Sequence, residues 1–217
     1  MITTTEIFYY SLFLLCIFCS FLASTENIPG LNILRILFLV GFASEMIVEV
    51  LQYYHLEENG PHFIYIPIEY LLICLWLKKN TNVLFVQKAI NISLFVYFPL
   101  VITMSVFYYG FGNFPSMIYM VNCLLIILWT VIMLLNFDVS EEISITSRPV
   151  FWILVTLTIF YSTIFFFTGG YNFLVEKSSL LGEKLRNDIN VSANFFLYIG
   201  FIYSFICSIK LKRFIHQ

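Results

Sequence analysis

Long apolar runs repeat along this chain and constrain its fold more than any other feature. About 20 apolar residues in a helix cross the roughly 30 Å hydrocarbon core of a bilayer. We predict seven such spans, at residues 7–22, 35–54, 63–77, 86–108, 115–137, 149–167 and 193–209. The predicted fold class is therefore all-α, a polytopic seven-helix transmembrane bundle that forms one domain over residues 1–217.

The composition excludes most soluble classes of protein. Hydrophobic residues make up 60% of the chain and charged residues 11%, against about 25% charged residues in an average soluble domain. Seven spans leave no segment for a soluble catalytic or DNA-binding domain, and a net charge of -2 does not favour nucleic acid as a partner. We expect the lipid bilayer as the main partner, with another membrane protein or a second copy of the chain as further candidates, and we expect no cofactor.

The basic residues predict the orientation of the spans, because cytoplasmic loops carry the excess of Lys and Arg. Of the 11 basic residues, eight fall at inner ends if the N-terminus lies outside the cytoplasm. These eight are Arg35, Lys78, Lys79, Lys88, Arg148, Lys210, Lys212 and Arg213. The other three, Lys177, Lys184 and Arg186, share one outer loop with acidic residues. We therefore predict a bacterial inner-membrane protein with its N-terminus outside and its C-terminus inside.

Acidic residues inside the predicted spans are the main candidates for function. Glu45, Glu49 and Gln52 recur at helical spacing in the second span, and Gly41 extends their stripe by one turn. Such a stripe is expected to face away from lipid. Glu69 lies at a similar depth in the third span, about 10 Å below the outer interface. A short hairpin joins the two spans, so we predict that they pack together with Glu49 and Glu69 facing each other.

Three further polar residues are predicted at comparable depth: Asn122 in the fifth span, with Asn194 and Tyr198 in the seventh. An ionised carboxylate near the bilayer centre costs at least about 2.5 kcal/mol. We therefore expect at least one of Glu45 and Glu49 to be protonated or neutralised by a cation. Three interpretations remain open: hydrogen-bonding glue between helices, a binding site for a ligand, proton or cation, and catalysis.

The outer hairpin carries a second group of polar residues, His55, Glu57, Glu58 and His62. Imidazole and carboxylate suit zinc or a similar divalent ion. The spacing matches no metal motif, however, and loop histidines beside acids are commonly just solvated. The four residues therefore remain a candidate metal site with a simple structural alternative.

Two other patterns bear on the helices themselves. Pro67 and Pro99 fall inside the third and fourth spans, where each removes a backbone hydrogen bond and can kink its helix. The outer loop over residues 171–190 alternates leucines with charged residues. We expect this loop to contain a short amphipathic helix lying over the mouth of the bundle.

Two stretches carry a resemblance to known sequences. They are Glu58-Asn59-Gly60-Pro61-His62-Phe63-Ile64-Tyr65-Ile66-Pro67-Ile68-Glu69-Tyr70-Leu71-Leu72 and Asn194-Phe195-Phe196-Leu197-Tyr198-Ile199-Gly200-Phe201-Ile202. The chain resembles a group of uncharacterised small seven-span membrane proteins of Bacteroidetes-type bacteria. The resemblance covers the whole chain, implies a seven-span fold, and marks Glu69 and Asn194 as positions of interest. It implies no chemistry.

Three classes of function fit these patterns. The first is a non-enzymatic membrane module, sensor-like or accessory, that acts through a partner and contains a buried acidic cluster. The second is a carrier or channel for a proton, a cation or a small solute. The third is a membrane enzyme that acts on a lipid at the outer hairpin. The sequence favours the first class.

Overall fold

A computed structural model describes residues 4–56, 59–109, 115–137, 144–177 and 179–215. Within these ranges the chain forms seven α-helices and no strand, which confirms the predicted all-α class. The helices are α1 (Thr4–Leu22), α2 (Leu31–Tyr53), α3 (Gly60–Lys79), α4 (Leu84–Met104), α5 (Ser116–Leu135), α6 (Pro149–Lys177) and α7 (Ser179–Ile215). A π-helical turn, Ser105–Tyr109, continues α4, and a 3-10 turn, Ile145–Ser147, precedes α6.

Residues with restricted or permissive backbones set several helix ends. Gly30 precedes α2 with φ 73°, in the left-handed region that glycine adopts without strain. Proline stands in the first turn of α3 and opens α6, where the missing N–H costs no helical hydrogen bond. Asn80 ends α3, and its Nδ2 donates to the Trp76 carbonyl oxygen at 2.8 Å.

In the part of the chain that the structure describes, six helical segments are long and apolar enough to cross a membrane. They are Thr5–Leu22, Gly60–Lys79, Leu84–Phe107, Ser116–Leu135, Pro149–Gly170 and Asp188–Leu211. The 23-residue helix α2, which carries Arg35, Glu45 and Glu49, is not among them. The architecture is that of a multi-pass helical membrane protein.

The prediction of an outer loop over residues 171–190 is wrong. Helix α6 continues to Lys177 and α7 begins at Ser179, so helix replaces most of the expected loop. Leu, Glu, Lys and Arg are strong helix formers, and they occur throughout this segment. At 1.5 Å per residue the 37-residue α7 is about 55 Å long, well beyond a hydrocarbon core of roughly 30 Å. The amphipathic segment is helical, as expected, but it is the first part of α7 and not a separate helix.

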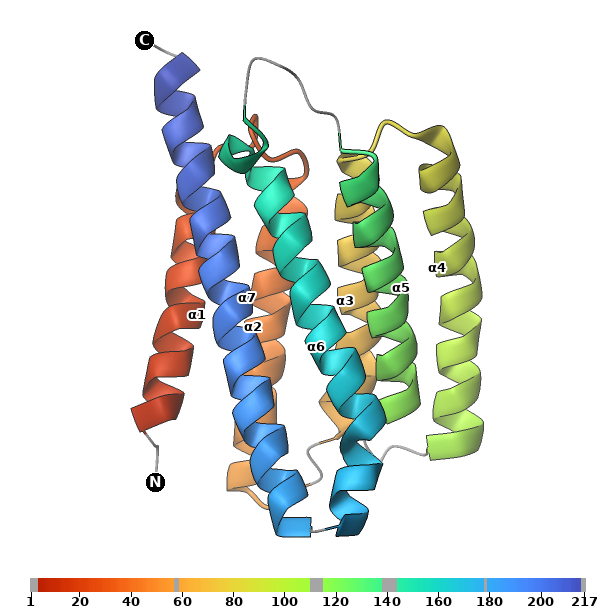
Figure 1. Cartoon of the computed structure of the whole chain (residues 1–217). Helices are drawn as coiled ribbons and strands as arrows, with labels where there is room; N and C mark the ends of the chain where they lie inside the picture. The colour runs from red at the N-terminus through yellow and green to blue at the C-terminus, as the bar shows by residue number, and fades with distance from the viewer. Residues whose placement is uncertain (1–3, 57–58, 110–114, 138–143, 178, 216–217) are drawn as a thin grey trace. The chain divides into compact units, whose positions relative to one another are not determined.

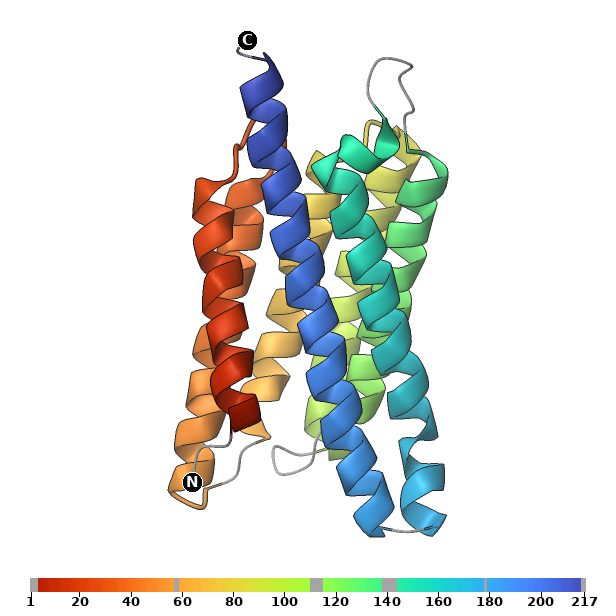
Figure 2. The same ribbon diagram turned by 60° about the vertical axis from the view of Figure 1, so that its left-hand side comes forward.

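The helices form two compact units. One unit comprises Met1–Ile28 and Thr130–Gln217, and the other comprises Pro29–Trp129. In the first unit α7 packs along both α6 and α1 (Figures 1 and 2). In the second unit α3 packs against α2 and α4. The predicted antiparallel pairing of the second and third spans is thus confirmed.

Small and hydroxyl-bearing residues hold the helices of the first unit together. Ser204 Oγ of α7 donates to the Pro149 carbonyl oxygen of α6 at 2.8 Å. Ser208, one turn further along α7, accepts from the Ser24 backbone N–H at 3.2 Å. In a bilayer the hydrophobic effect does not drive helices together, because lipid tails are as apolar as the helix surfaces. Close packing and hydrogen bonds between helices drive their association instead.

Candidate functional site

Glu69 is the buried acid of the unit Pro29–Trp129. It lies in the middle of α3, between α2 and α4, and its side chain is only 7% exposed. The Tyr65 hydroxyl, one turn earlier on the same helix, donates to Glu69 Oε1 at 3.1 Å. Asn122 of α5 donates from Nδ2 to Glu69 Oε2 at 3.2 Å. Both carboxyl oxygens therefore accept from fixed donors, an arrangement that suits the ionised form.

Two further polar atoms beside this carboxyl are buried and have no hydrogen-bond partner. They are Asn122 Oδ1 and the Tyr97 hydroxyl oxygen. Asn122 is completely buried and Tyr97 is 2% exposed. Since the Asn122 carboxamide already bonds to Glu69 through its nitrogen, its oxygen lies next to the same carboxyl. Tyr97, on α4, is close enough to Glu69 to interact with it electrostatically.

Glu45 brings α2 into the same group. Its side chain is half-buried, and Tyr65 is within electrostatic range of both Glu45 and Glu69. All four helices of the unit thus contribute polar groups around one carboxyl. We call Glu45, Tyr65, Glu69, Tyr97 and Asn122 the Glu69 site. An unpartnered buried acceptor costs about 1–3 kcal/mol, so the site offers a proton or a cation a favourable place to bind.

The residues of α2 that were predicted for this cluster differ in their exposure. Gly41 is buried, Glu45 is half-buried, and Glu49 and Gln52 are exposed, so exposure increases towards the end of α2. The inward-facing stripe is therefore confirmed only in its first part. That Glu49 faces Glu69 stays a prediction.

Asn194 and Tyr198 belong to the other unit. Tyr198 is buried where α7 packs on α1: its hydroxyl lies 3.1 Å from that of Tyr9, and its ring stacks on Phe13 at 4.4 Å between centroids. Asn194 donates from Nδ2 to the Asn190 carbonyl oxygen on its own helix at 2.9 Å. These contacts of Asn194 and Tyr198 are all made within α1 and α7.

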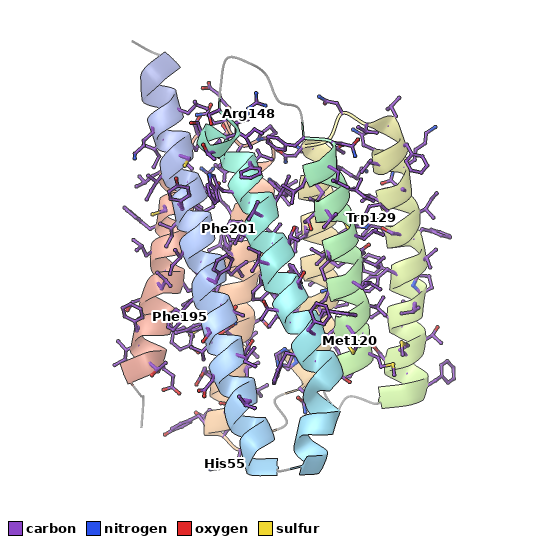
Figure 3. The ribbon with its side chains drawn as sticks, viewed as in Figure 1. His55, Met120, Trp129, Arg148, Phe195 and Phe201 are labelled. Atoms are coloured by element: carbon purple, nitrogen blue, oxygen red, sulfur yellow. The ribbon has the colours of Figure 1, made fainter. Side chains whose placement is uncertain are left out.

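The candidate metal residues lie around the turn between α2 and α3. His55 is exposed and has φ 55° (Figure 3), and His62 is half-buried in the first turn of α3. Glu57 and Glu58 lie outside the described residues. Among the residues that the structure does describe, no three or more His, Cys, Asp or Glu side chains are grouped to hold a metal ion. The metal site stays a prediction.

The tyrosines around Glu69 were not predicted from the sequence. Tyr65 precedes Glu69 by four residues, and that helical spacing could have indicated their contact. Nothing in the sequence connects Tyr97 with Glu69, because the two belong to different helices. Long-range pairing between helices is not encoded in local spacing.

A second hydrogen-bonded chain crosses the same unit. Trp129 Nε1 (labelled in Figure 3) lies 3.3 Å from the Tyr70 hydroxyl oxygen, which lies 2.8 Å from Ser93 Oγ. Ser93 Oγ in turn donates to the Ile90 carbonyl oxygen at 2.8 Å. Each donor has one proton, so the chain runs from Trp129 through Tyr70 and Ser93 to Ile90. It ties α5 to α3 and α4.

Replacing Tyr70 by phenylalanine is expected to lower the free energy of unfolding by about 1–3 kcal/mol, because the buried Trp129 N–H loses its acceptor. Denaturation in detergent micelles, followed by circular dichroism, measures the change. Tyr53→Phe removes a hydroxyl from a residue that is 79% exposed and serves as the control. Equal stability of both variants would contradict the role of the chain.

Comparison with known proteins found no relative of this chain. No protein-family model matches the chain, and neither a curated protein nor a solved structure matches it. The function is therefore inferred from the residues of the chain itself.

Proposed function

We propose that the protein is a non-enzymatic membrane module that takes up a small cation, in the simplest case a proton, at the Glu69 site. The observation that carries this proposal is a group of buried oxygen atoms around the Glu69 carboxyl that can accept hydrogen bonds. Glu69 presents a carboxyl, the unpartnered Asn122 Oδ1 belongs to the carboxamide that bonds to it, and the unpartnered Tyr97 hydroxyl is within electrostatic range of it. Tyrosines and an asparagine suit the binding of a positive charge more than the formation of a covalent intermediate.

The position of basic residues supports the proposal. Within Pro29–Trp129 the basic residues are Arg35, Lys78, Lys79 and Lys88, and each lies within two turns of a helix end. Lys78 is nine residues from Glu69 along α3, about 13.5 Å at 1.5 Å per residue. A buried carboxylate is costly in a membrane unless a positive charge approaches it. A bound proton or cation supplies that charge.

The proposal includes a specific membrane arrangement. Helix α2 is the seventh span, the N-terminus lies outside and the C-terminus inside, and the membrane is the bacterial inner membrane. The eight-to-three distribution of Lys and Arg supports this orientation. The module acts through a partner protein or a second copy, and the proposal extends to membership of the small seven-span group that the sequence resembles.

A carrier function is the second candidate, and the interruption of α4 favours it. Pro99 lies inside α4, and the helix continues as a π-helical turn at Ser105–Tyr109. Such irregular turns are frequent at functional sites and mark places where a helix can rearrange. Because Tyr97 is on the same helix, a movement of α4 would change the Glu69 site. Cation or proton flux into liposomes that contain the protein distinguishes a carrier from a sensor.

Glu69→Gln tests the proposed function, because glutamine keeps the size of the side chain but cannot ionise, and its N–H can donate to the Tyr65 hydroxyl while its oxygen accepts from Asn122. We expect the melting temperature of the wild type to vary with pH between about 5 and 8, or with added monovalent or divalent cations. The Glu69→Gln variant is expected to fold and to lose that dependence.

Glu26→Gln is the control, since Glu26 is an exposed acid outside the unit that holds the Glu69 site. It should respond as the wild type does. A wild-type melting temperature that changes neither with pH nor with cations would rule out uptake at Glu69. So would a Glu69→Gln variant with the full wild-type response.

A further inference from the structure

The start of α2 offers hydrogen-bond donors at one end of the unit Pro29–Trp129. Its N-cap is Gly30, which has no side chain to cap the helix. The Ile33 N–H donates to the Gly30 carbonyl oxygen at 2.8 Å, and the N–H groups before it point out of the helix end. The helix dipole adds partial positive charge at this end. A helix start of this kind favours an anion.

Trp76 adds a buried donor that points to the same place. Its side chain is completely buried, and its indole Nε1 has no hydrogen-bond partner. The neighbouring ring atom, Cδ1, lies 3.4 Å from the position that a Cβ on Gly30 would occupy. The N–H edge of the indole therefore faces the start of α2. A buried N–H without an acceptor costs about 1–3 kcal/mol, and an anion is an acceptor.

The stem of Lys79 lies over the same point, and its ammonium adds a positive charge at this end of α3. Its Cδ and Cβ lie 3.1 and 3.4 Å from the Cβ position of Gly30, and the residue is exposed. The stem of Lys79 thus covers Gly30 and the indole edge, and a rotation of this flexible side chain opens them to a ligand. Asn80 fixes the arrangement, because its Nδ2 donates both to the Pro29 and to the Trp76 carbonyl oxygens, at 2.9 and 2.8 Å.

Within the unit Pro29–Trp129, the helix ends around this point carry basic residues. The start of α2, the end of α3 and the start of α4 lie at the same end of this unit (Figure 1). They carry Arg35, Lys78, Lys79 and Lys88, whereas the acidic residues that the structure describes in Pro29–Trp129, Glu45, Glu49 and Glu69, lie on other turns of α2 and α3. Lys78 Nζ donates to Asn91 Oδ1 at 2.7 Å. Because the asparagine amide is neutral, this hydrogen bond does not cancel the positive charge of the lysine.

We propose that Gly30, Trp76 and Lys79 form a binding site for a phosphate-type oxyanion. Backbone N–H groups, an indole N–H and an ammonium are all donors, and a tetrahedral oxyanion can accept from several of them at once. The anion is the headgroup phosphate of an anionic phospholipid or a free phosphate. Helices that can cross a membrane end at this level, where phospholipid headgroups lie.

Binding to the full-length protein in neutral detergent tests the proposal. Phosphatidylglycerol, phosphatidylcholine and inorganic phosphate are added separately, and bound lipid or ion is followed by native mass spectrometry and by the shift in melting temperature. Trp76→Phe keeps the ring and removes the N–H, and Lys79→Gln keeps the stem and removes the charge. Lys88→Gln removes an exposed charge on α4 and is the control.

We expect phosphatidylglycerol or inorganic phosphate to bind, and the one that binds identifies the source of the anion. Trp76→Phe and Lys79→Gln are each expected to weaken that binding by about tenfold or more, since each removes a hydrogen bond to a charged group. Lys88→Gln should stay within about twofold of the wild type. The proposal is overturned if neither anion binds, or if Lys79→Gln and Lys88→Gln weaken binding equally. If Trp76→Phe does not fold, the comparison of the two lysine variants decides.

Discussion

Replacing Asn122 by aspartate is expected to lower the free energy of unfolding at pH 8 by about 3–5 kcal/mol, the usual cost of an uncompensated buried charge. Asn122 is completely buried, and its Nδ2 lies 3.2 Å from Glu69 Oε2. The variant places a second carboxyl at that distance and removes the donor. The two acids then compete for one proton, so stability is expected to fall as pH rises and to recover on acidification. Denaturation in detergent between about pH 5 and 8 measures how the free energy of unfolding of the variant depends on pH.

Asn82→Asp makes the same change at an exposed residue between α3 and α4. It should alter the free energy of unfolding by less than about 0.5 kcal/mol, as surface substitutions usually do. An Asn122→Asp variant with wild-type stability at pH 8 would contradict the hydrogen bond between Asn122 and Glu69. It would also remove the basis for an acceptor-rich site.

Replacing Gly200 by alanine is expected to cost about 1–3 kcal/mol of stability, the usual effect of overpacking. A Cβ at Gly200 would lie 2.7 Å from Thr156 Cγ2 and 3.0 Å from Thr156 Cβ, and it would overlap Thr156 Oγ1. Thr156 is 2% exposed and cannot move aside. The helices α6 and α7 must therefore separate at this contact, which outweighs a gain in helix propensity of up to about 1 kcal/mol.

Gly170→Ala, on α6, is the control, because a Cβ there meets nothing within 4 Å. It should leave stability unchanged or raise it by up to about 1 kcal/mol. Adding Thr156→Ala to Gly200→Ala should recover part of the loss, because the two side chains compete for the same space. A Gly200→Ala variant as stable as the Gly170→Ala variant would show that α6 and α7 do not depend on this close approach.

The sequence predicted the helices well because hydrophobic length is a local property. Each of the seven predicted spans overlaps a helix, and the helices α2 to α5 end within a few residues of the prediction. The error at residues 171–190 has a physical reason. Hydropathy marks where a helix leaves the hydrocarbon core, but helix-forming polar residues allow α7 to begin well before Asp188, where its apolar segment starts.

The site was predicted in part. Glu69 and Asn122 were recognised individually as polar residues in apolar spans, and the structure joins them by a hydrogen bond. Their tyrosine partners were missed, because Tyr is common in membrane helices and carries no signal of its own. Glu49 shares a helical face with Glu45, but α2 leaves the protein interior before that turn. Helical periodicity gives the face of a helix and not how far along the helix a neighbour covers it.

The charge state of Glu69 is the central claim, and infrared difference spectroscopy measures it most directly. Spectra of the protein in lipid are recorded before and after acidification, and again after exchange of the bound cation. The account predicts a carboxylic-acid C=O band that appears when Glu69 gains a proton, is absent from Glu69→Gln, and is retained in Glu26→Gln. The same band in Glu69→Gln as in the wild type would contradict the account.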